Sequence, residues 1–179
     1  MAVIDLSLST DPTVDNAPAI SAAAVPGNVV NLPPGEFAIG ATIVSRAQLV
    51  GKGPGETRLK VMRDALPTEL TPTGLSVRAH IRHIGPDASS ENIRVIGRNV
   101  NKDYTPLREF EHAFAFWGVT RPKLLRCRAD FVWGDGYYFG PPDGGSTPCV
   151  DMLVDDFESN GVGRQNGAVA AHTGVGQIR

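Results

Sequence analysis

Two hydrophobic spacings follow one another along the chain. Between residues 15 and 27, Ile20 and the surrounding alanines have a helical spacing, with Asp15 or Asn16 as N-cap and Pro26-Gly27 as the stop. From residue 28 onward, apolar and polar residues alternate in runs of three to five, separated by glycine, proline and polar corners. The pattern predicts an extended lead-in over residues 1–14, a capping helix over 15–27, and then almost exclusively short β-strands.

The alternation places these strands at specific positions. The expected strands cover residues 29–32, 36–40, 42–44, 48–51, 58–61, 75–77, 93–96, 113–116, 124–127, 137–139, 150–154 and 168–171. Their shortness, together with 20 glycines and 14 prolines, indicates an architecture rich in corners.

Two neighbouring stretches, 125–139 and 150–171, have the same order of strand, polar corner and strand. Matching Phe131 with Phe157 gives an offset of 26 residues, whereas matching the apolar alternation gives 25, a difference that a bulge would absorb. A weaker copy runs from Ile93 to Phe116, with an insertion at residues 101–111. A repeat of this length predicts the coils of a parallel β-helix.

One such coil cannot fold alone, because its few inward side chains do not offset the conformational entropy of about 25 residues. Neighbouring coils must therefore share a core. Residues 175–179 read as a further strand without a polar cap. We therefore expect residues 28–179 to be the N-terminal coils of a solenoid that continues in a longer protein or is covered by another chain.

Charge and composition exclude several classes of protein. The chain has 17 basic and 19 acidic residues and no basic stripe, so we expect no nucleic-acid partner. No apolar run approaches the ~18 residues of a membrane span, and the first residues do not form a signal peptide. Cys127 and Cys149 lack zinc-site spacing, and we expect both to be ordinary thiols, with a disulfide between them as the less favoured alternative. We expect neither metal nor cofactor.

Three N-terminal motifs resemble the entry of the pectate-lyase-like superfamily. They are residues 15–20, the run Val29-Val30-Asn31-Leu32-Pro33-Pro34-Gly35, and the corner Gly51-Lys52-Gly53-Pro54-Gly55. The resemblance implies an all-β fold, a right-handed single-stranded parallel β-helix with a short N-terminal capping helix. The superfamily includes polysaccharide lyases, hydrolases, epimerases and bacteriophage tailspike or tail-fibre proteins.

Among these functions, the resemblance favours a phage tail protein. The motifs of galacturonan hydrolases are missing, and Gly134-Asp135-Gly136 is the nearest approach to them. We expect a tailspike, fibre or minor tail protein in the virion tail, a homotrimer in contact with other tail proteins, that binds or depolymerises a cell-surface glycan. The alternative is an extracellular bacterial polysaccharide lyase, glycoside hydrolase or epimerase of the same fold.

Asp135, Asp155 and Asp156 are the candidate catalytic residues. Stacked coils would bring carboxylates from neighbouring turns, including Asp130, to the ~5–9.5 Å separations that glycosidases use. The other interpretation is that each aspartate ends a strand by bonding corner amides.

Trp133, Tyr138 and Arg164 are the candidate substrate-binding residues. The rings would supply a surface on which sugars stack, and the guanidinium of Arg164 would form two hydrogen bonds with a uronate carboxylate. Alternation predicts that Tyr137 and Phe139 share one face while Tyr138 takes the other. The alternative is that the rings belong to the core and that Arg164 bonds backbone carbonyls.

Overall fold

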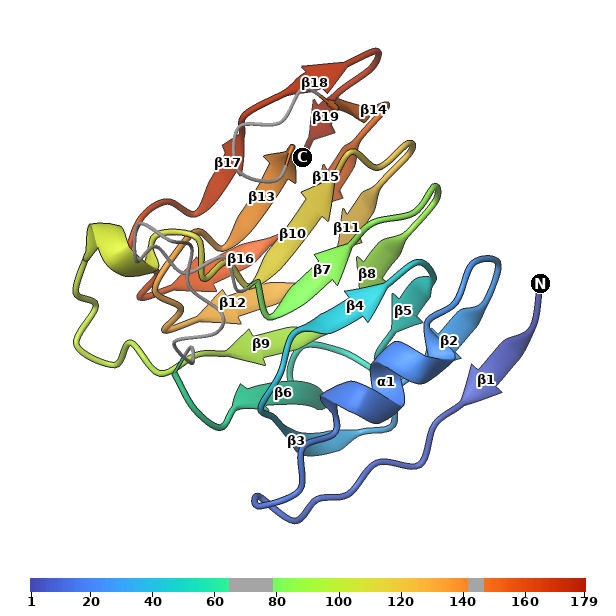
Figure 1. Ribbon diagram of the computed structural model, residues 1–179, viewed down its shortest axis with the longest axis vertical. Helices are drawn as coiled ribbons and strands as arrows, with labels where there is room; N and C mark the ends of the chain where they lie inside the picture. The colour runs from blue at the N-terminus through green and yellow to red at the C-terminus, as the bar shows by residue number, and fades with distance from the viewer. Residues whose placement is uncertain (65–78, 142–146) are drawn as a thin grey trace.

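Short strands stack in register from coil to coil in the computed structural model, which describes residues 1–64, 79–141 and 147–179 (Figure 1). The helix α1 (Ala17–Ala23) precedes the coils, and the 3-10 helix η2 (Pro106–Arg108) lies in a projecting loop. The fold is a nearly all-β parallel β-helix, as predicted.

The strands form three long sheets, here called A, B and C, and one short pair. Sheet A contains β1 (Val3–Asp5), β2 (Val29–Asn31), β5 (Gln48–Val50), β8 (Ser89–Glu91), β11 (Lys123–Leu125), β15 (Leu153–Asp155) and β19 (Gln177–Ile178). Sheet B contains β3 (Gly35–Ile39), β6 (Thr57–Val61), β9 (Arg94–Ile96), β12 (Arg128–Asp130) and β16 (Glu158–Asn160). Sheet C contains β4 (Ile43–Ser45), β7 (Ile81–His83), β10 (Phe114–Trp117), β13 (Tyr137–Gly140) and β17 (Gly167–Val169). The short pair is β14 (Cys149–Val150) with β18 (His172–Thr173).

Each coil visits the sheets in the order A, B, C, and neighbouring strands in each sheet run parallel. Alternate side chains therefore form columns that point inward along the whole solenoid. On sheet B one such column consists of Phe37, Leu59, Val95 and Ala129, all buried. These columns form the core that a single coil could not provide.

The inner column of sheet C is partly aromatic. The rings of His83 and Phe116 stack with centroids 4.5 Å apart, and those of Phe116 and Phe139 stack at 4.4 Å. The register of β7, β10 and β13 aligns these three residues. His83 also shares a hydrogen bond of 2.9 Å with the hydroxyl of Ser90, and burial lowers its pKa to about 3. A neutral imidazole thus packs as a core residue.

The helix α1 covers one end of the solenoid, next to β4 (Figure 1). Its residues Ala17 and Ile20 are buried against the core, and the hydroxyl of Ser21 accepts a hydrogen bond from the amide of Val44 at 3.1 Å. The Asp15 carboxylate caps the first helical amide, that of Ala17, at 2.9 Å, and also accepts the amide of Gly40 at 2.7 Å. This carboxylate thereby joins the helix to the end of β3.

The observed register differs from the expected offset of 25 or 26 residues. Arg128 pairs with Glu158, 30 positions later, and the preceding turn is longer still, because Asn92 and Arg126 lie 34 apart at equivalent corners. The expected match of Phe131 with Phe157 is therefore wrong. Phe131 occupies a corner in the left-handed region, whereas Phe157 packs against the core.

Corners in the left-handed region also shorten one predicted strand and divide another. Arg126 has a φ of 48°, so the strand expected over 124–127 ends at Leu125. Asp151 has a φ of 54°, so the strand expected over 150–154 becomes β14 and β15. Strands β1, β7, β8, β12, β16 and β18 were not predicted. The expected strand at 75–77 lies outside the described residues.

The insertion predicted at 101–111 is confirmed as the loop that contains η2 (Figure 1). Ile178 is 59% exposed although it continues a column of sheet A in which Leu49, Leu124 and Val154 are buried. No helix in the described ranges is long and apolar enough to cross a membrane.

Gly51 is predicted to be essential to the contact between two coils. An added Cβ would lie 2.3 Å from the carbonyl oxygen of Asn92, whereas at Gly55, in the same corner, nothing lies within 4 Å. We expect Gly51→Ala to lower the free energy of unfolding by about 1–3 kcal/mol, because backbone must move, and Gly55→Ala to change it by less than about 0.5 kcal/mol. Urea denaturation measures both, and equal effects would contradict the proposed close approach.

Candidate functional site

Asp135 lies at the corner between β12 and β13, with its side chain fully buried. Arg164 donates from Nη1 to one carboxylate oxygen at 3.1 Å, and the backbone amide of Gln165 donates to the other at 3.1 Å. The amide of Asp135 donates to Nδ1 of His112 at 3.0 Å. Because His112 precedes β10 and Arg164 follows β16, this aspartate ties three consecutive coils together.

The electrostatics of this corner follow from burial. Burial raises the pKa of Asp135 to about 6, against the opposing influence of Arg164 and of the Gln165 amide, and Glu109 raises it further. Burial also lowers the pKa of His112 to about 3, so its imidazole is neutral. Its Nδ1 accepts a hydrogen bond, which places the proton on Nε2.

Asp155 and Asp156 lie at a different corner. Asp155 ends β15 on sheet A and faces Arg179 at 3.6 Å. Asp156 follows in the left-handed region, and its amide donates to the carbonyl of Arg179 at 3.0 Å. The corner of Asp135 lies at the opposite end of the sheet B strands. The structure therefore does not bring the three candidate catalytic carboxylates into one site.

Asp130 is also enclosed by its neighbours. It is buried at the end of β12, where Arg128 Nε approaches it at 3.0 Å and Arg94 forms a second ion pair. Both aspartates of this segment thus fit the interpretation as structural residues at strand ends.

The candidate sugar-stacking rings already contact protein groups. The guanidinium of Arg108 lies 4.3 Å from the ring centroid of Trp133. Tyr138 stacks on His112 at 4.8 Å, and its hydroxyl donates to the carbonyl of Pro141 at 3.1 Å. Tyr137 and Phe139 point inward while Tyr138 points outward, as the alternation predicted.

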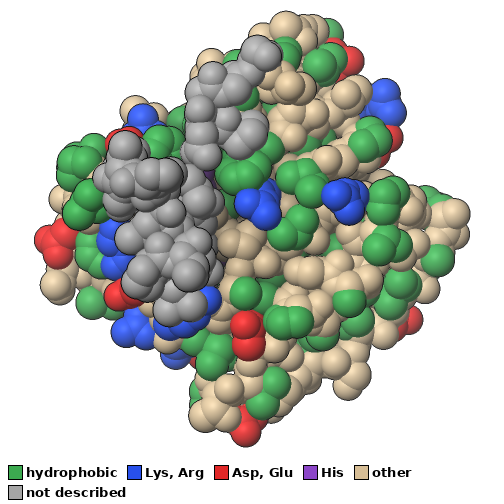
Figure 2. Space-filling model, viewed as in Figure 1, with side chains coloured by type: hydrophobic (Ala, Val, Ile, Leu, Met, Phe, Trp, Pro, Cys, Tyr) green, Lys and Arg blue, Asp and Glu red, His purple; other side chains and the backbone are tan. Residues whose placement is uncertain are grey.

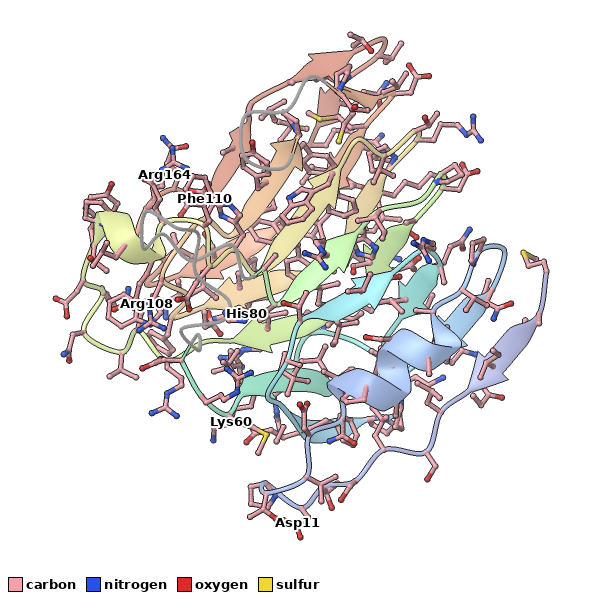
Figure 3. The ribbon with its side chains drawn as sticks, in the orientation of Figure 1. Asp11, Lys60, His80, Arg108, Phe110 and Arg164 are labelled. Atoms are coloured by element: carbon pink, nitrogen blue, oxygen red, sulfur yellow. The ribbon has the colours of Figure 1, made fainter. Side chains whose placement is uncertain are left out.

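Arg108, which sequence reasoning missed, links this corner to its surroundings. Its guanidinium contacts Glu111 at 2.7 Å and Asp64 at 3.0 Å. Figure 3 shows Arg108, Phe110 and Arg164 on the side where the η2 loop projects, and in Figure 2 blue and red side chains gather at that edge. No motif marks Arg108, because its partners come from three separate segments.

A groove with a volume of about 970 Å³ lies on the outer face of sheet B. Strands β3 and β6 contribute its floor, the lead-in contributes one wall, and the residues after β9 contribute the other. In the described part of the chain it is lined by Thr10, Pro12, Thr13, Glu36, Ala38, Lys60, Val61, Met62, Gly97, Arg98 and Val100. Figure 3 shows Lys60 and the lead-in residue Asp11 on the same side of the molecule.

Charged side chains of the groove are held in place by one another. Lys60 Nζ lies 3.1 Å from a carboxylate oxygen of Glu36, and Arg58 Nε lies 3.5 Å from the other. Arg98 faces Asp64 at 3.6 Å and also donates to the carbonyl of Met62. The groove thus offers ordered donors and an acceptor beside apolar side chains, as sites for polar small molecules and polymers do.

The two cysteines of the chain do not form a disulfide. The described ranges contain no group of three or more His, Cys, Asp or Glu side chains placed to hold a metal ion. Cys127 and Cys149 are free and buried, so the expectation of two ordinary thiols is confirmed. Burial raises the pKa of the Cys127 thiol to about 12, so it is not a nucleophile near neutral pH.

Comparison with known proteins gives a similarity of fold. No family model matches the chain, and no curated protein matches it. The solved structure of the ORF18 protein of Geobacillus virus E2 is similar, with a TM-score of 0.54 and 14% sequence identity over 92% of this chain. The chain spans 40% of the length of that protein. At this identity the similarity supports the solenoid architecture alone.

The buried Asp135 predicts a specific pH dependence of stability. The pKa of Asp135 is about 6 in the folded protein and near 3.8 in the unfolded chain. Between pH 3.8 and 6 the folded protein therefore holds a proton on Asp135 that the unfolded chain has lost. Its contribution is fully present below pH 3.8 and is lost as the pH rises through 6. We expect the native protein to gain up to about 3 kcal/mol over Asp135→Asn as the pH falls from 7 to 4.

Urea denaturation at several pH values measures this difference, with Asp155→Asn as the variant that removes a carboxylate at the other corner. His83 and His112 both have a pKa of about 3 in the native protein, so neither gains a proton in the folded state over this pH range. A difference that is independent of pH would contradict the assignment.

Proposed function

We propose that this chain is part of a bacteriophage tail protein, a tailspike, fibre or minor tail protein, that binds host cell-surface polysaccharide in the groove on sheet B. The observation that carries the proposal is the groove itself, about 970 Å³ in volume and built from three segments on the outside of a solenoid. The ORF18 protein of Geobacillus virus E2 has a similar fold, and we extend its viral origin to this chain as part of the proposal.

A parallel solenoid suits a long, repetitive ligand. Its strands recur every ~4.8 Å along the axis, so equivalent side chains form rows on the outer faces. On sheet B one outer row runs through Glu36, Arg58, Arg94, Arg128 and Glu158. The groove opens onto the β3 and β6 end of this face, where a polymer could extend along the row.

The carboxylates support binding in preference to cleavage. A general acid or a nucleophile must reach the substrate, yet Asp135 and Asp130 are fully buried and ion-paired within the protein. Asp155 and Asp156 lie at another corner. A polysaccharide lyase, hydrolase or epimerase is therefore the alternative function, which turnover of a bound polysaccharide would favour.

We further propose that the chain forms a homotrimer and contacts other tail proteins in the virion. Val169, Val175 and Ile178 expose apolar surface on the last described coil. A neighbouring subunit of the proposed trimer would bury this surface.

An array of bacterial surface polysaccharides tests the proposed function. We expect the native protein to bind at least one of them without releasing reducing ends or unsaturated products. Lys60→Ala should weaken binding about tenfold by removing a charged donor, whereas Lys123→Ala, exposed on β11, should leave it unchanged.

Failure of the native protein to bind any polysaccharide would contradict the proposal. Turnover of a bound polysaccharide would favour the enzymatic alternative. Light scattering tests the trimer separately, and a monomer would contradict that part.

A further inference from the structure

The groove on sheet B combines an apolar floor with charged groups at its two ends. Ala38 faces outward from β3, and Met62 and Val100, which follow β6 and β9, line the groove with it, whereas Val61 packs in the core. None of the three lining side chains can donate a strong hydrogen bond. An apolar ligand group on this floor gains van der Waals contact with carbon and sulfur atoms. A polar ligand group there loses its hydrogen bonds to water and finds no replacement.

The charged groups mark the two ends of the floor along the strand direction. Glu36 lies near the start of β3 and holds Lys60 at 3.1 Å. Arg98 follows β9 and is held by Asp64 at 3.6 Å, beside the exposed Val100. A ligand that fits must therefore present polar groups at its ends and an apolar group between them.

We infer that the groove selects sugar units that carry a methyl group, either as the C6 methyl of a 6-deoxyhexose or within an acetyl substituent. This inference rests on the proposed function and names the sugar class that the groove takes. The methyl group packs on Ala38, Met62 and Val100, while the ring hydroxyls bond Glu36 and Lys60. An unmodified hexose would place a hydroxyl on the same floor, where it lacks a partner.

Two features of the groove argue against other ligands. Its described lining contains no aromatic ring, so sugar recognition here depends on aliphatic contact instead of stacking. Its floor is the face of sheet B, in which β6 is paired on both sides by β3 and β9. A peptide therefore cannot bind at β6 by adding a strand.

Saturation-transfer NMR on matched sugars tests the inference. The probes are L-rhamnose against L-mannose, L-fucose against L-galactose, and N-acetylglucosamine against glucose. We expect about tenfold tighter binding of the methyl-bearing member of at least one pair, with the strongest saturation at its methyl protons. The first two pairs report on the deoxy carbon and the third on the acetyl group.

Val100→Asp is the test variant, and Val175→Asp is its matched control, since the two valines are 68% and 63% exposed. We expect Val100→Asp to abolish the preference and Val175→Asp to retain it. A preference that survives Val100→Asp would overturn the assignment to this groove.

The remaining outcomes separate the two proposals. Binding that is lost in Lys60→Ala but equal for both members of every pair would overturn the inference and leave the proposed function standing. Absence of binding to every sugar and every polysaccharide would overturn both.

Discussion

Hydrogen bonds between neighbouring coils are the interaction on which this structure depends. Its strands have two to five residues, and most of their amides and carbonyls pair with the coil before or after. The amide of Leu32 bonds Val50, and that of Gly51 bonds Glu91, each at 2.8 Å. This pairing aligns the inner columns into a core. It also brings the lead-in, β3, β6 and the residues after β9 together around one groove.

The fold class could be predicted because alternation and corners are local properties of the sequence. The helix near Ile20 and most of the strands could be predicted for the same reason. The register could not, since it depends on corners where Arg126 and Asp151 adopt a positive φ that usually marks glycine or asparagine. Without that knowledge, alternation across such a corner looks like one continuous strand.

The candidate site was predictable only in part. Asp135 and Arg164 do meet, but they join coils inside the protein, where burial raises the pKa of the carboxyl to about 6. The groove residues carry no recognisable motif. Lys60 reaches Glu36 across 24 positions, and Arg98 reaches the Met62 carbonyl across 36, so only the three-dimensional register reveals them.

We propose that the stacking of coils creates a glycan-binding groove between the lead-in and the loop after β9. Hydrogen–deuterium exchange, measured with and without a polysaccharide that the protein binds, tests this proposal. We expect added protection at residues 10–13, 36–38, 60–62 and 97–100, with none at 133–138 or 164. Protection confined to the corner of Trp133, Tyr138 and Arg164 would contradict it.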